Sequence, residues 1–258
     1  MSLHSAAMRG SFAIALSLAG LSVTCACGSD KPKSNPFEVK KDTVEPPKIV
    51  APPKPEGPPE FVVAAEGPKV AWTYVMLEKP DGKQKLRAEI GEHSKFVSGK
   101  DVAVKAERPA KLAHVSEMMQ ALFEAGATSI AVSTDTRTEF PKTVTFSPRK
   151  SASTSPCSVV AKVLSERRIA VWPLKGGTAV KSPKGLAGPD LSMAGASLES
   201  AATRCKGSDV VLVSADEDVE WGLVYDLSAA TQKLEKAHFG KVVLLLPPPV
   251  AGRPVKLD

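Results

Sequence analysis

The chain has 258 residues, a net charge of +6, 43% hydrophobic residues and only 5% aromatic residues. This length allows two small domains, and the composition predicts cores of valine, leucine and alanine with few large side chains. The 22 prolines are unevenly spread, which excludes a uniformly globular chain and indicates a linker. The positive charge agrees with acidic partners but does not constrain the fold.

The N-terminus has the organisation of an export signal. Arg9 precedes an uncharged run, residues 11–27, which is rich in leucine and alanine and ends in small residues. We therefore expect an exported protein of the bacterial cell envelope, anchored to a membrane, with its globular part in the periplasm. Export argues against nucleic acid as a partner.

The end of this run resembles the lipobox of bacterial lipoproteins. Ala26 precedes Cys27, as the motif requires, although Thr24 stands where a leucine is usual. We expect residues 1–27 to be a signal peptide or lipoprotein anchor, with Cys27 lipidated and Cys25 as the alternative. A plain signal peptide or an uncleaved helix also stays open, since about 17 apolar residues are at the lower limit for spanning a bilayer.

Residues 28–69 are predicted to be a Pro-rich linker. Their prolines alternate with lysine and glutamate, and such a segment cannot bury enough apolar surface to fold. It favours extended polyproline II, which suits a tether that holds a domain away from a membrane. A recognition site for a proline-binding partner is the alternative interpretation.

A β–α–β pattern occurs twice and organises the rest of the chain. In the later copy, a β-branched run at 210–213 is followed by an acidic cluster that we expect to begin a helix, and 241–246 is a second buried strand. The earlier copy runs from a strand at 102–106 through a helix to a strand at 129–133. Such a repeat indicates that the chain contains two related structural units.

The repeat defines the expected domains and fold class. We predict a mixed α/β fold with two tandem units, each a small mixed sheet with helices packed on one face. Copy 1 spans 70–149 and includes an extra strand at 143–146; copy 2 spans 158–247, after a linker at 150–157 and before a tail at 248–258.

Further elements follow from local patterns. Copy 1 should begin with a strand at 70–77, for which 85–90 is a candidate hairpin partner. Copy 2 should begin with a hairpin of 158–164 and 168–174, followed by a helix that Asp190 caps. Copy 1 shows no helix of that quality, which makes it the degenerate copy.

The motif around the last helix resembles the periplasmic domain of the ExbD/TolR proteins, accessory subunits of proton-driven biopolymer-transport motors. The residues that carry this resemblance are Asp216, Asp218, Trp221, Gly222, Asp226 and Lys241. The resemblance covers about 40 residues well and implies an α/β periplasmic domain. The family anchors through a helix with a proton-binding aspartate, and residues 11–27 contain no acidic residue.

No catalytic, metal or cofactor motif is found. The histidines are isolated, and His114 is predicted to be solvated beside an apolar helix stripe. The acidic cluster at 216–218 is interpreted as helix capping rather than as a metal site. Cys157 and Cys205 are expected to form a disulfide, as is usual for two cysteines in an exported domain.

One region is strongly basic. Between Arg137 and Lys184, ten basic residues stand against two acidic ones. From it we predict a basic surface formed by Lys162, Arg167, Arg168 and Lys175, which contacts peptidoglycan or anionic lipid. The alternative is an ordinary solvated face.

The sequence therefore predicts a non-enzymatic envelope binding or scaffold protein without a cofactor. Its expected partner is envelope material or a transport-complex protein, and an oligomer is compatible with the sequence. The alternative is an accessory subunit of an ExbB/ExbD-type complex, anchored by an uncleaved N-terminal helix.

Overall fold

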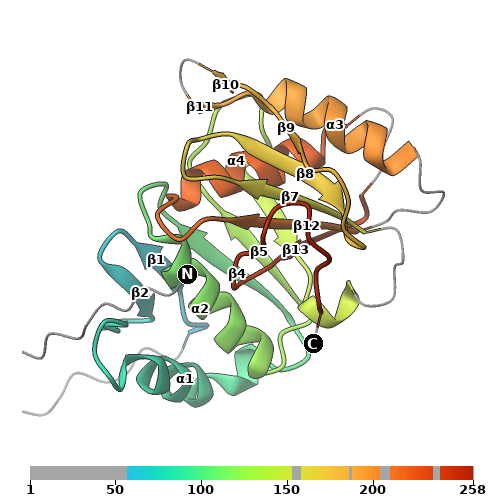
Figure 1. Cartoon of the computed structure of the whole chain (residues 1–258). Coiled ribbons are helices and arrows are strands. Elements are labelled where there is room, and N and C mark those ends of the chain that lie inside the picture. The colour runs from blue at the N-terminus through green and yellow to red at the C-terminus, as the bar shows by residue number, and fades with distance from the viewer. Residues whose placement is uncertain (1–56, 153–157, 186–187, 204–209, 235–238, 258) are drawn as a thin grey trace, which may run out of the picture. The chain divides into compact units, whose positions relative to one another are not determined.

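The computed structural model describes residues 57–152, 158–185, 188–203, 210–234 and 239–257. This part is mixed α/β, with four α-helices and one large mixed sheet, which confirms the predicted class (Figure 1). The predicted signal segment, most of the predicted linker, and Cys25, Cys27, Cys157 and Cys205 lie outside the described residues, so export, lipidation and the disulfide stay predictions.

We call the elements from β1 to β6 the first half. They are β1 (Phe61–Ala64), β2 (Gly67–Val70), β3 (Thr73–Tyr74), α1 (Gly82–Glu92), η1 (Ser94–Phe96), β4 (Asp101–Ala106), α2 (Leu112–Glu124), β5 (Ser129–Ser133) and β6 (Thr143–Phe146).

The second half follows the short 3-10 helix η2 (Arg149–Ser151). Its elements are β7 (Val159–Val163), β8 (Ile169–Pro173), β9 (Val180–Lys181), β10 (Lys184–Gly185), β11 (Gly188–Pro189), α3 (Leu191–Thr203), β12 (Val210–Ala215), α4 (Trp221–Thr231) and β13 (Lys241–Leu244).

Within the described residues, eleven strands form one sheet in the order β3-β2-β1-β4-β5-β6-β13-β12-β7-β8-β9. In each half a hairpin leads into three parallel strands, β1-β4-β5 in the first and β7-β12-β13 in the second. Strand β6 is antiparallel to β5 and parallel to β13, so it joins the two sets. The pairing repeats, but the sheet is continuous, and the division into two tandem units stays a prediction.

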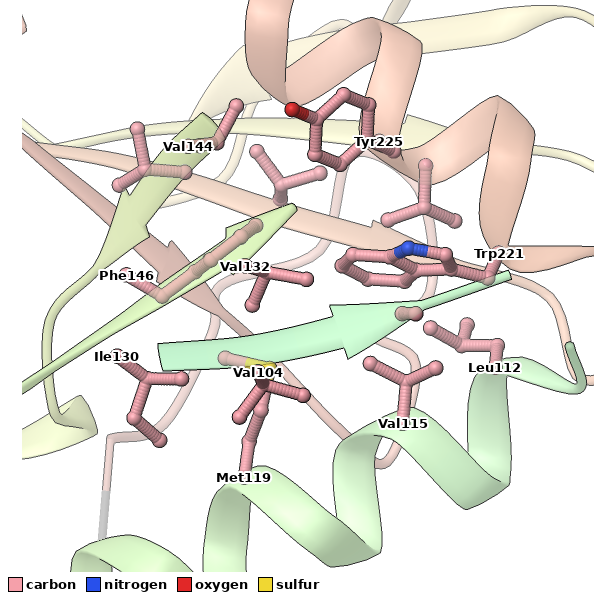
Figure 2. Close-up of a cluster of buried hydrophobic side chains, with 14 of the residues drawn as sticks. Val104, Leu112, Val115, Met119, Ile130, Val132, Val144, Phe146, Trp221 and Tyr225 are labelled. Atoms are coloured by element: carbon pink, nitrogen blue, oxygen red, sulfur yellow. The ribbon is translucent and has the colours of Figure 1, made fainter. Parts of the chain in front are cut away.

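All four helices contribute to one hydrophobic core on one face of this sheet, which we call the front face. Leu112, Val115 and Met119 of α2 point at the sheet, and the indole of Trp221 at the start of α4 reaches the same cluster (Figure 2). The ring of Phe146 lies 5.8 Å from Trp221, centroid to centroid. The two halves therefore share their front core.

Several boundaries differ from the sequence-based expectation. Strand β1 and all of β2 except Val70 lie within the predicted linker, so the sheet begins at Phe61 rather than at residue 70. Phe61 and Val63 are buried. The sequence analysis did not predict this strand because its apolar run is short and the residues around it are rich in proline. The expected single strand at 70–77 is instead a hairpin turn: Val70 ends β2, and only Thr73–Tyr74 form the next strand, β3.

The predicted hairpin partner at 85–90 is wrong, because this segment is the helix α1. Its two fully buried side chains, Leu86 and Ile90, are four residues apart and face α2. Glu117 of α2 holds α1 in place through ion pairs with Lys83 at 2.8 Å and Arg87 at 2.9 Å. These partners lie about thirty residues away, where local patterns do not reveal them.

Candidate binding surface

The face of the sheet opposite the helices, which we call the back face, differs between the halves. In the second half it is apolar and covered: Val160, Trp172, Leu212 and Val243 are buried beneath the C-terminal residues 249–257. The Trp172 indole N–H donates to the carbonyl of Arg253 at 3.0 Å. Figure 1 shows this C-terminal segment, in dark red, passing over the strands of the second half.

In the first half the back face is open. The strand register places one row of side chains across it: Tyr74, Lys69, Val62, Lys105 and Ser133. All of them are half-buried or exposed, and the strand β4 alternates between buried and exposed residues along its whole length. This alternation is typical of a strand with one solvated face.

A groove of about 670 Å³ crosses this back face along β4. Lys100 and Lys105 line it, together with Glu60, Phe96 and Ser133. Within the described residues, neither lysine forms an ion pair, and Lys100 lies over the Phe96 ring at 5.9 Å. The groove therefore presents two lysine ammonium groups without an ionic partner among the described residues, and the acidic residues of its lining are Glu60 and Asp101.

The nearest acidic side chain of β4 does not neutralise these lysines. Asp101 accepts hydrogen bonds from the hydroxyls of Ser129 and Thr128, both at 2.6 Å. The Ser129 bond, and then the Thr128 bond, lower the pKa of Asp101 below its usual value. The carboxylate is thus held at the end of the strand.

The outer strand β3 carries a second exposed feature, which we call the aromatic edge. Trp72, Tyr74 and Met76 are 74%, 61% and 60% exposed. Trp72 lies in the turn before β3, Tyr74 in the strand and Met76 just after it. The ammonium of Lys69 lies 5.4 Å from the Trp72 ring and 5.6 Å from the Tyr74 ring, so these two rings share one side. Exposed apolar side chains grouped in this way mark interaction sites.

Three residues of the predicted ExbD/TolR-like motif, Trp221, Gly222 and Asp226, are structural contacts between the halves. The buried indole of Trp221 donates to Thr134 Oγ1 at 2.8 Å. The buried carboxylate of Asp226 accepts two hydrogen bonds from Arg108, at 2.9 and 2.8 Å, and one from Thr136 at 2.6 Å. This geometry is a bidentate charge-assisted pair, the strong form of such contacts.

Gly222 allows the two halves to approach closely. A Cβ atom there would lie 3.1 Å from the Cβ and from the carbonyl oxygen of Arg108. The Gly222 N–H donates to that same carbonyl at 2.9 Å, and the Trp221 N–H donates to Ala110 at 2.9 Å. Asp226 also lies beside Tyr225, whose pKa is raised by burial to about 12.

The interpretation of the acidic cluster as a helix cap is wrong. Helix α4 begins at Trp221 after Glu220, and no acidic residue lies in its first turn. Asp216 instead bonds Lys162 at 2.6 Å and the backbone N–H of Ser165 at 2.9 Å, while Asp218 accepts from the Ser165 hydroxyl at 2.6 Å. Burial opposes ionisation of Asp216, but the Lys162 and Ser165 bonds outweigh it and lower the pKa.

The predicted basic surface is also wrong as a single surface. Lys162 is buried, paired with Asp216, and donates to the carbonyl of Pro249 at 2.9 Å. Arg167 and Arg168 lie in the turn before β8, whereas Lys175 follows its end, so the strand separates them. A charge count along the chain cannot distinguish a buried lysine from a free one.

His114 is buried rather than solvated. Its Nε2 lies 3.2 Å from a carboxylate oxygen of Glu78, and its Nδ1 has no hydrogen-bond partner among the described residues. Burial lowers the pKa of His114, and the opposing attraction of Glu78 is weaker.

The residues that the sequence analysis missed are Lys100, Lys105, Trp72 and Tyr74. Their signal was the period-two alternation of two strands, which shows that one face is solvated but not which face. Lys241 of the motif is exposed at the start of β13. Within the described ranges, no cluster of side chains suits a metal ion, and no helix is both long and apolar enough to cross a bilayer.

A further hollow of about 730 Å³ lies between α3, α4 and the loop after β5. Its charged residues are of both signs, Arg137 and Lys233 against Asp190 and Glu199. Asp190 caps α3 as expected, because its carboxylate accepts from the N–H groups of Ser192 and Met193, both at 3.1 Å. The hollow does not select one kind of ligand.

No family model, no curated protein and no solved structure matches the chain. The resemblance to the ExbD/TolR proteins therefore stays a prediction that rests on the motif residues.

Proposed function

We propose that this chain is a membrane-tethered, non-enzymatic binding or scaffold protein of the bacterial cell envelope. The N-terminal segment would provide the anchor, the Pro-rich segment the reach, and the α/β unit the binding surface. The observation that carries the proposal is the open back face of the first half, where Lys100 and Lys105 line a groove without ionic partners among the described residues.

The chemistry of this groove suits an anionic polymer or head group. Two free ammonium groups, a half-buried aromatic ring and a serine hydroxyl offer charge, contact area and hydrogen bonding. Peptidoglycan carboxylates and anionic lipid head groups share the required negative charge. Because the contacts are exposed, binding should weaken as salt rises.

The test is cosedimentation of the purified full chain with isolated cell-wall material and, in a second arm, with anionic lipid vesicles. Lys100→Glu combined with Lys105→Glu should weaken retention at least about tenfold, since each lysine near an anionic surface contributes about 1 kcal/mol. The two arms separate the two anionic sources.

The matched control is Arg167→Glu combined with Lys175→Glu, which reverses two exposed charges outside the groove. This control should retain nearly full binding. Equal losses in both variants, or binding that neither salt nor charge reversal changes, would remove the groove as the binding surface.

The anchor is tested separately. Cys27→Ser should release the protein from the membrane fraction, whereas Cys25→Ser should not. If an uncleaved helix anchors the chain and collapse of the proton gradient alters its crosslinking to membrane partners, the transport-complex alternative is the better account.

A further inference from the structure

The two outer strands of the sheet occupy corresponding places but differ in their chemistry. Tyr74 of β3 pairs with Lys69 of β2, and Lys181 of β9 pairs with Ala170 of β8, at the same point of the two hairpins. Lysine and proline on an edge strand commonly prevent it from pairing with a strand of another chain, and Lys181 of β9 is followed by Pro183. The segment 71–77 at the other edge has no charged residue and no proline.

Among the described residues, no strand pairs with the outer side of β3. The Val75 N–H donates to the carbonyl of Pro68 at 2.9 Å, so Val75 faces β2. Since alternate residues of an antiparallel strand point their backbone groups in opposite directions, the N–H and C=O of Tyr74 point away from the sheet. An edge with these groups exposed and apolar side chains beside them is a template for strand addition.

We propose that β3 pairs antiparallel with β3 of a second copy of this chain, giving a two-fold symmetric dimer. This inference is independent of the proposed envelope binding. The outward backbone groups of Tyr74 define the register: Tyr74 lies opposite Tyr74 of the second copy. In this register Trp72, in the turn before β3, comes opposite Met76, which follows the strand. Both contacts are favourable, as an aromatic cross-strand pair and as a thioether–aromatic contact.

The surface is self-complementary in shape as well as in register. A hollow of about 400 Å³ beside the strand is lined by Glu66, Tyr74, Val75 and Met76. Because Trp72 of the second copy lies opposite Met76, its exposed indole can enter this hollow, where Glu66 can accept the indole N–H. Each copy therefore supplies both the projecting ring and the hollow, as an isologous interface requires.

Charge favours a second copy over a charged peptide. Lys69, whose ammonium lies over the Trp72 and Tyr74 rings, belongs to β2, one strand inside the edge. The backbones of the two Lys69 residues of a dimer are therefore about 14 Å apart, beyond the screening length at physiological salt. The guarded β9 edge prevents the pairing from continuing at the other end, so the assembly closes as a dimer. The short strand makes a small interface, and the dimer should dissociate reversibly on dilution.

The register is tested by oxidative crosslinking of the full chain, with peptide mapping by mass spectrometry. Tyr74→Cys should give a homolinked peptide that joins residue 74 to residue 74, which can arise only between two chains. Thr73→Cys, at a position that is also exposed, should not give one, because residue 73 lies opposite residue 75 and its own counterpart is beyond disulfide reach. Equal crosslinking at both positions would mean random collision and would overturn the proposal.

The affinity is tested by sedimentation equilibrium of the full chain in nonionic detergent. Tyr74→Lys places a lysine at the β3 edge, at the position that corresponds to Lys181 of β9. In the dimer two ammonium groups would then lie opposite each other, which should weaken dimerisation at least about tenfold. Tyr74→Phe should leave it nearly unchanged. A monomer at all concentrations, or a dimer that Tyr74→Lys leaves intact, would contradict pairing through β3.

Discussion

The back faces of the two halves show how one strand pattern can serve two purposes. At corresponding register positions the first half has Ala103, Lys105 and Ala131, and the second half has Leu212, Ser214 and Val243. The apolar set is covered by the C-terminal segment, while the small and charged set is open. A sheet face needs a cover only where its side chains are apolar, so the uncovered face is the one available for binding.

The largest effect should come from the front core that the halves share. Trp221→Ala should lower the free energy of unfolding by about 3–5 kcal/mol, because it removes a fully buried indole between the halves. Urea unfolding should remain a single transition. Trp72→Ala, which truncates a 74% exposed indole, should change monomer stability by less than about 0.5 kcal/mol. Two separate transitions in the Trp221 variant would show that the halves fold independently.

The cover of the second back face can be removed. Deleting residues 250–258 uncovers the apolar face and removes three partly buried side chains, Ala251, Val255 and Leu257. We expect a loss of about 3 kcal/mol in unfolding free energy and increased binding of a hydrophobic dye. The control is Lys256→Ala, an exposed position, which should leave both measurements unchanged. A truncated chain that binds no additional dye would contradict the covering role.

The lysines of the two back faces should respond differently to the same substitution. Lys162→Met leaves Asp216 without its cation and should cost about 2 kcal/mol, less than for a fully buried pair because the Asp216 side chain is 29% exposed. Lys105→Met should have an effect of less than about 0.5 kcal/mol. Urea unfolding of both variants gives the comparison, and equal effects would mean that Lys162 is free in solution.

The Lys162 effect also has a predictable pH dependence. The folded-state pKa of Asp216 is lowered, so its pairing stabilises the fold above the ordinary aspartate pKa of about 3.8 and is lost as pH falls through the folded-state value. The stability difference between the parent and Lys162→Met should therefore shrink in acid. A difference that stays constant into acid would exclude the ion pair as its cause.

The smallest effect concerns His114, which occupies the place in α2 that Leu223 occupies in α4. Because burial lowers the pKa of His114, the folded state binds its proton less readily than the unfolded state. Stability should fall as pH falls below about 6.5, and His114→Gln should remove this part of the slope. Thermal unfolding between pH 5 and 8 measures it, and an unchanged slope would assign the effect to other groups.

The repeated elements could be predicted because their signals are local. Helix α2 has an apolar stripe, α3 has Asp190 as its cap, and β12 and β13 are β-branched runs. The helix α1 was missed because it has only two fully buried apolar side chains, and its ion pairs with Glu117 come from a distant segment. Strand β1 was not predicted because it has only four residues and lies in a segment whose many prolines are typical of an unfolded linker.

The candidate site was the least predictable part. A count of charges along 137–184 placed the basic surface in the second half, where Lys162 is buried. Lys100 and Lys105, which have no ionic partner among the described residues, stand near acidic residues in the sequence, so a charge count along the chain does not single them out. Whether a lysine is free depends on which carboxylate the fold brings to it, and Asp216 lies 54 positions from Lys162.

The sequence by itself determined the α/β class, the β–α–β pattern and most helices of this protein, because hydrophobic period and capping residues act over a few neighbouring positions. Only the tertiary structure decided that the strands join into one sheet through β6, that the C-terminal segment covers one back face, and which of the two lysines Lys105 and Lys162 has an ionic partner among the described residues. These properties depend on contacts between residues far apart in the chain, and such contacts exist only once the backbone has folded.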